Sequence, residues 1–107
     1  MKGYWGGNMW IYMNDSFLSI IENDELHLTV RARRKEDIER VFPDASVVET
    51  PDRDYRYRAV MKRNDVAIVI AKRIMGIDYY NFKDSVKEYD RKHVYSEIWG
   101  ETLKLQK

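Results

Sequence analysis

The feature that most constrains this chain is a series of short β-type segments separated by Asn-Asp pairs. Three such runs open the sequence, at 9–13 (MWIYM), 16–22 (SFLSIIE) and 25–33 (ELHLTVRAR), and an Asn-Asp pair fills each gap. Asn and Asp tolerate the left-handed backbone that is typical of two-residue hairpin loops. The pattern therefore predicts a three-stranded antiparallel meander.

The third run alternates like a half-buried strand. One set of side chains is apolar and the other is polar: Leu26, Leu28, Val30 and Ala32, against His27, Thr29, Arg31 and Arg33. Because successive side chains point to opposite faces of a sheet, a period of two separates the sets. We expect the apolar set to face the core, with Arg31 and Arg33 on the outer face.

Helices and two further strands follow. Residues 35–42 predict a short helix, with acidic side chains in its first turn and Pro43 behind it. Two strands are predicted at 45–50 and 55–62, joined by the turn 51–54 (PDRD). A helix from Asn64, as its N-cap, to Met75 ends at Gly76, and two more helices are expected with Asp78 and Asp90 as caps.

The order of elements is therefore βββ-α-ββ-α-α-α, and it predicts an α+β fold. Residues 25–75 spell β-α-β-β-α, most of a ferredoxin-like split βαβ unit, whose missing strand the N-terminal meander could supply. We predict a single, mostly antiparallel sheet of about five strands with helices packed on one face. Residues 1–8, rich in glycine, predict a flexible leader, and residues 9–107 predict a single domain.

Composition excludes several classes of function. The 19 basic and 18 acidic residues leave a net charge of +1, so only a segregated patch could bind nucleic acid electrostatically. There is no cysteine, which excludes disulfides, Cys-based zinc sites and thiol chemistry. His27 and His93 are scattered, and no nucleotide-binding or nucleophile motif appears, so we predict no metal, no cofactor and no catalytic residue. Without a membrane-length apolar run or a signal peptide, a cytoplasmic location and no membrane partner are expected.

The stretch 54–58 (DYRYR) supplies the first candidate surface. With Tyr55 and Tyr57 assigned to the helix-packed face, the side chains that share the outer face are Arg31, Arg33, Arg56 and Arg58. Guanidinium groups suit bidentate contact with phosphate or carboxylate, so this row could bind RNA, a nucleotide or an acidic protein segment. Alternatively the row is solvated and pairs with Glu25, Glu49 or Asp54. Tyrosines on the helix-packed face argue against RNA recognition, which uses aromatic side chains on the open face.

The second candidate is the stretch 78–83 (DYYNFK), at a predicted helix N-terminus where an anion is favoured. Asn81 and Lys83 could assist such binding. In the alternative interpretation Asp78 caps the helix, Tyr79 and Phe82 pack, and Lys83 is solvated. Trp5, in the leader, is either disordered or docks on a neighbouring chain.

Several stretches, among them LTVRARRKEDIERVFP, VVETPDRDYRYRAV and IDYYNFKDSV, resemble a family of small bacterial proteins without an established activity. The resemblance extends from Met9 to the C-terminal Trp-containing helix. It implies the order of elements, and it singles out Arg31, Arg33, residues 54–58, and the Asp-Tyr and Asn-Phe-Lys stretches within 78–83. It implies no chemistry.

Taken together, these features predict a small non-enzymatic intracellular domain that binds an unknown protein partner or self-associates. Two alternatives remain open. One is binding of an anion or phosphate, as nucleotide or RNA, through the arginine-lined sheet face. The other is a small metal-independent enzyme.

Overall fold

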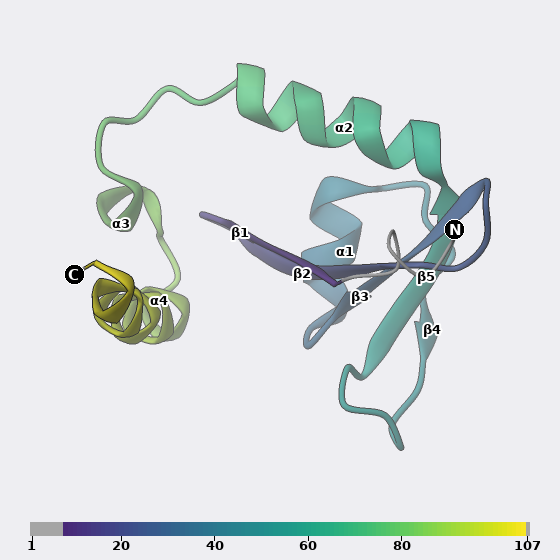
Figure 1. The fold of residues 1–107 in the computed structure, drawn as a ribbon, viewed down its shortest axis with the longest axis horizontal. Helices are drawn as coiled ribbons and strands as arrows, with labels where there is room; N and C mark the ends of the chain where they lie inside the picture. The colour runs from purple at the N-terminus through teal and green to yellow at the C-terminus, as the bar shows by residue number, and fades with distance from the viewer. Residues whose placement is uncertain (1–7, 107) are drawn as a thin grey trace. The chain divides into compact units, whose positions relative to one another are not determined.

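The computed structural model describes residues 8–106. Of the predicted leader only Asn8 is included, so the leader and Trp5 lie outside the described residues. The chain forms two compact units that divide between Ile77 and Asp78. The first contains a sheet and two helices, and the second contains the remaining helices (Figure 1). The single domain predicted for 9–107 stays a prediction.

The sheet of the first unit has five strands, as predicted. They are β1 (Met9–Met13), β2 (Ser16–Glu22), β3 (His27–Ala32), β4 (Val48–Glu49) and β5 (Tyr57–Lys62). Their order is β1-β2-β3-β5-β4, and every neighbouring pair is antiparallel. β5 therefore lies between β3 and β4, an order consistent with a split βαβ unit in which β2 supplies the strand beside β3.

Two helices, α1 (Lys35–Val41) and α2 (Arg63–Met75), pack on the same face of this sheet. The core between the layers consists of Leu18, Ile20, Val30, Ala32, Ile38, Val41, Phe42, Ala59 and Val66. This confirms the inward orientation of Val30 and Ala32. Leu26 was predicted to face the core as well, but it is 71% exposed, because β3 begins one residue later and leaves Leu26 in the preceding turn.

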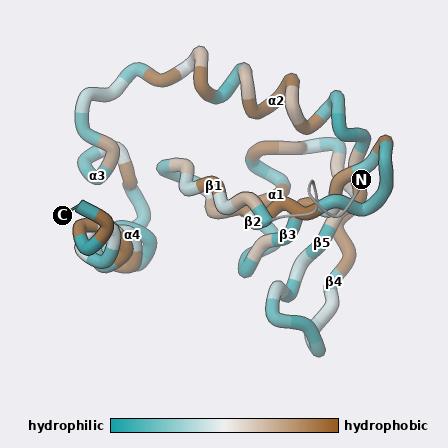
Figure 2. Tube along the Cα trace, viewed as in Figure 1, coloured by the Kyte–Doolittle hydropathy of each residue, from teal (hydrophilic) through white to brown (hydrophobic). Residues whose placement is uncertain are grey.

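Helix α2 is held above the sheet at both ends. Near its start Arg63 Nη2 lies 3.2 Å from Glu22 Oε2, and near its end Arg73 Nη1 lies 2.8 Å from Asp15 Oδ1. Val66 is its one buried residue, although apolar residues recur along its whole length (Figure 2). Lys62, and not Asn64 as predicted, occupies the N-cap position, because the helix follows β5 without a loop.

The hairpin turns differ from the prediction in backbone conformation. Within residues 8–106 no residue other than glycine has a positive φ, so Asn14 and Asp15 close their hairpin without the left-handed conformation. The second turn instead uses a side chain: Asp24 Oδ1 accepts hydrogen bonds from the backbone N–H groups of Leu26 and His27, both at 2.9 Å. The side chain of His27 and the amide of Leu26 lower the pKa of Asp24.

The second unit contains α3 (Phe82–Ser85), α4 (Tyr89–Thr102) and a 3-10 turn (Leu103–Leu105). Asn81, not Asp78, caps α3, since its side chain accepts a hydrogen bond from the Asp84 amide at 3.3 Å. Asp90 lies inside α4, one residue after its start, and Glu88 occupies the N-cap position. Phe82 stacks on Tyr95 with 5.7 Å between ring centroids, so the expected packing of Phe82 is confirmed.

Candidate functional site

Three of the predicted arginines, Arg31, Arg33 and Arg58, converge on the sheet face opposite the helices. We call them the arginine cluster. Arg31 on β3 and Arg58 on β5 are direct cross-strand partners, and their neighbours Val30 and Ala59 belong to the core on the other face. The guanidinium carbons of Arg31 and Arg33 lie 4.5 and 4.3 Å from the centroid of the same ring, that of Tyr55.

Tyr55 was predicted to face the helices, and this assignment is wrong. β5 begins at Tyr57, so Tyr55 belongs to the hydrophilic loop between β4 and β5 and does not follow the alternation of the strand (Figure 2). The loop returns its ring to the arginine side, where it is only 5% exposed. A cation over an aromatic face is attracted by the ring quadrupole, which explains this position. Tyr57, within the strand, does pack against the core as predicted.

Aromatic side chains extend from Tyr55 across the same face. The Phe17 ring lies 6.4 Å from that of Tyr55, stacks on Tyr12 at 4.5 Å, and meets the edge of Trp10 at 6.3 Å. Burial, followed by the proximity of Tyr55, raises the pKa of Tyr12. Trp10 is 62% exposed. The face that carries the arginines is therefore also the aromatic one, contrary to the prediction.

Arg31 is the most enclosed member of the cluster. It is 7% exposed, and its Nη2 donates a hydrogen bond of 2.6 Å to Ser19 Oγ. Among residues 8–106 its Nε atom has no hydrogen-bond partner, and the same holds for the Nε atom of Arg58. Arg33 is exposed, and its Nη1 donates to the backbone carbonyl of Asp54. Neither Arg31 nor Arg33 forms an ion pair with another residue of this range.

The cluster carries excess positive charge. The closest carboxylate is Asp54, whose Oδ1 lies 3.4 Å from Arg58 Nη2. Burial lowers the pKa of Arg58, and the charges of Arg53 and Arg31 lower it further, while Asp54 opposes them. Three guanidinium groups, those of Arg31, Arg53 and Arg58 itself, thus meet at this position against one carboxylate. Such a concentration of positive charge attracts anions.

Arg56 does not join the cluster. Its Nε lies 2.8 Å from Glu49 Oε2, and both side chains are about half exposed. This hydrogen bond and the charge of Glu49 raise the pKa of Arg56. The alternative considered for all four arginines, a solvated side chain paired with an acidic residue, therefore applies to Arg56. Its partner Glu49 lies on the edge strand β4.

Asn81 and Lys83 belong to the second unit, and their observed contacts lie within it. Asn81 caps α3, while Lys83 Nζ lies 4.2 Å from the centroid of the Trp99 ring. α3 has only four residues, so few peptide dipoles align and little positive potential accumulates at its N-terminus. The alternative considered for this segment gave the cap to Asp78 and left Lys83 solvated; in the structure Asn81 is the cap and Lys83 contacts Trp99.

Sequence reasoning missed two contributors to the site, Arg53 and the ring of Tyr55 above the arginines. The turn residues Pro51 and Asp52 could have indicated the position of Tyr55. If the loop that they begin had been extended past residue 54, Tyr55 would have been assigned to the loop and not to β5. It also missed Asp37, which is 2% exposed and accepts a 2.9 Å hydrogen bond at Oδ2 from the Phe17 amide. Nothing in the short helix 35–41 signals that contact between distant segments.

Across 8–106, no three His, Cys, Asp or Glu side chains form a group that could hold a metal ion. No helix in this range is long and apolar enough to cross a membrane.

No protein-family model matches the chain, and no curated protein or solved structure shows a significant match. The resemblance to a bacterial family therefore stays an expectation.

Proposed function

We propose that the protein binds a phosphate-bearing ligand, a nucleotide or single-stranded RNA, at the arginine cluster. The observation that carries this proposal is the direct cross-strand pairing of Arg31 with Arg58, with a single carboxylate nearby. Like charges opposite one another destabilise a sheet. A bound phosphate would neutralise the charges of Arg31 and Arg58. Binding a ligand therefore accounts for a pairing that folding alone would disfavour.

The three arginines contribute differently to this proposed site. Arg33 is exposed and the side chain of Arg58 is 16% exposed, so these two can reach a ligand directly. Arg31 is buried against the Tyr55 ring and adds positive potential to the site. The planar guanidinium group forms paired, charge-assisted hydrogen bonds with phosphate oxygens, and this chemistry favours phosphate as the recognised group.

The aromatic side chains favour a ligand that contains nucleobases. Trp10 is exposed and lies on the arginine face, joined to Tyr55 through Phe17. Open sheet faces that bind single-stranded RNA combine cations for the backbone with rings for base stacking. Because the Tyr55 ring lies with Arg31 and Arg33 on the open face, its position does not count against RNA recognition.

The proposal is tested by fluorescence anisotropy with a labelled single-stranded oligonucleotide across a range of salt concentrations. We expect binding that weakens with salt, and Arg33→Gln or Arg58→Gln should each reduce the slope of log affinity against log salt by about one. Arg56→Gln is the matched control, because Arg56 is already paired with Glu49, and it should leave the slope unchanged.

Competition distinguishes the two ligand sources. A mononucleotide that displaces the oligonucleotide with similar affinity would indicate a nucleotide site, whereas displacement only by oligonucleotides would indicate an RNA strand. Equal losses in the Arg56 and Arg58 variants, or no salt-dependent binding at all, would contradict the proposal.

A second function, association with a protein or with another copy of the chain, is supported by the exposed edge strand β1. We also propose an intracellular, cytoplasmic location, which the absence of cysteine supports.

A further inference from the structure

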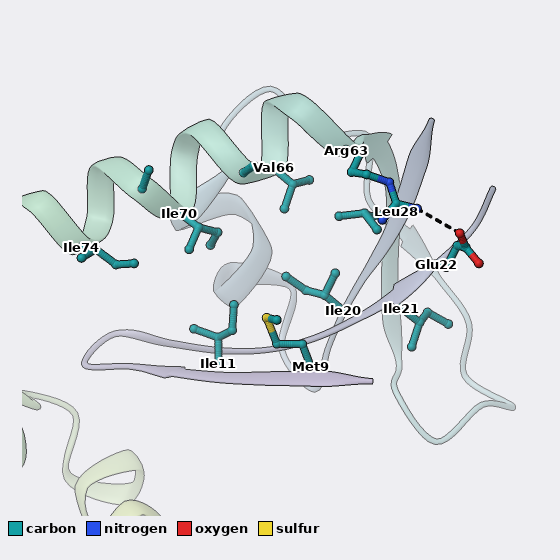
Figure 3. A pocket seen from close by; sticks show the side chains of 12 residues that line it. Met9, Ile11, Ile20, Ile21, Glu22, Leu28, Arg63, Val66, Ile70 and Ile74 are labelled. Carbon is teal, nitrogen blue, oxygen red and sulfur yellow. Dashed lines mark hydrogen bonds and ion pairs between the residues drawn. The ribbon is translucent and has the colours of Figure 1, made fainter. Parts of the chain in front are cut away.

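An apolar cavity lies between α2 and the sheet, on the face opposite the arginine cluster. Its volume is about 430 Å³. Ile11 and Ile20 point from the strands towards α2, and Val66 and Ile70 point from α2 towards the strands (Figure 3). Met9 and Ile11 of β1 are part of the lining, so the cavity reaches the edge of the sheet.

The strand at that edge lacks the features that usually prevent pairing. β1 has the sequence MWIYM, without charge or proline, and within residues 8–106 it pairs only with β2. Alternate residues of an antiparallel edge strand direct their N–H and C=O groups away from the sheet. Natural edge strands are protected by lysine, proline, bulges or shortness. The opposite edge illustrates such protection, since β4 has two residues and Pro51 follows shortly after it.

We propose that β1 pairs with β1 of a second copy of the chain, in antiparallel orientation about a two-fold axis. A uniform strand is self-complementary, because the same unpaired backbone groups face one another on both copies. Met9 and Trp10 are 60% and 62% exposed, and pairing would cover them together with the cavity edge. The net charge of +1 produces little repulsion between copies.

Sedimentation equilibrium over a wide concentration range tests this pairing. We expect a reversible monomer–dimer equilibrium for the wild-type chain. Trp10→Lys places a charge on the edge and should raise the dimer dissociation constant at least about tenfold. Val48→Lys is the matched control, because Val48 is 58% exposed on the other edge strand, and it should leave the constant unchanged.

Amide hydrogen exchange of the wild-type chain tests the same interface without a substitution. Amides of β1 that point away from β2 should become protected as the concentration rises, while those of β4 should not. A monomer at every concentration, with these β1 amides exchanging rapidly, would overturn the proposal. A dimer that Val48→Lys disrupts as strongly as Trp10→Lys would overturn it as well.

Discussion

At the scale of single residues, the arginine cluster combines strong local attraction with a repulsion between guanidinium groups that Asp54 offsets only in part. Stacking against Tyr55 and the hydrogen bond to Ser19 hold Arg31 in place. Its cross-strand partner Arg58 carries the same charge in a mostly enclosed position. A site that concentrates charge for a ligand is expected to be less stable than the same fold without that charge.

Arg58→Gln should therefore separate stability from binding. Removing this charge relieves the repulsion with Arg31, so the free energy of unfolding should be unchanged or higher by up to about 1 kcal/mol. Oligonucleotide affinity should fall in the same variant. Urea unfolding followed by tryptophan fluorescence gives the stability, with Arg56→Gln as the control that loses an exposed ion pair. A loss of more than about 2 kcal/mol would indicate that Arg58 serves the fold instead of a ligand.

At the scale of elements, the turn between β2 and β3 contains a carboxylate whose charge supports the local structure. Asp24 accepts hydrogen bonds from two backbone amides and from the ring of His27. These bonds lower the pKa of Asp24 in the folded state. The unfolded chain therefore binds more protons near the ordinary aspartate pKa, and the stabilisation is present above that value and lost as pH falls through the lowered one.

Asp24→Asn should flatten this part of the pH dependence. The amide oxygen can still accept hydrogen bonds, but it does not titrate. The urea midpoint of the wild-type protein should fall more steeply below the ordinary aspartate pKa than that of the variant, and the two curves should run parallel at neutral pH. Identical slopes in acid would show that the charge of Asp24 does not support the turn.

Features of the elements that depend on local sequence patterns could be predicted, and features that depend on distant contacts could not. The three-stranded meander and the outer position of Arg31 and Arg58 followed from alternation and turn residues, because both act locally. Tyr55 was placed on the wrong face because the predicted strand began at residue 55, before the true start of β5 at Tyr57. Asp78 was expected to cap a helix that instead begins at Phe82, since several polar residues in that segment can serve as caps. The cavity beneath α2 depends on contacts between distant segments, which no local pattern encodes.

At the scale of the whole molecule, the first unit separates two kinds of surface on the two faces of one sheet. One face meets α1 and α2 and encloses the core and the apolar cavity. The other carries the arginine cluster and the aromatic side chains. The alternation of the strands keeps these two faces apart, and Trp10 of β1 is the residue where the arginine face meets the β1 edge.

The arginine cluster is tested most directly by NMR spectroscopy of the arginine side chains during titration with a short single-stranded RNA. The Nε–H signals of Arg31, Arg33 and Arg58 should shift together and saturate at one ligand concentration, while that of Arg56 should remain in place. Signals that do not move, or that shift equally for all arginines of the chain, would contradict a specific phosphate site on this face.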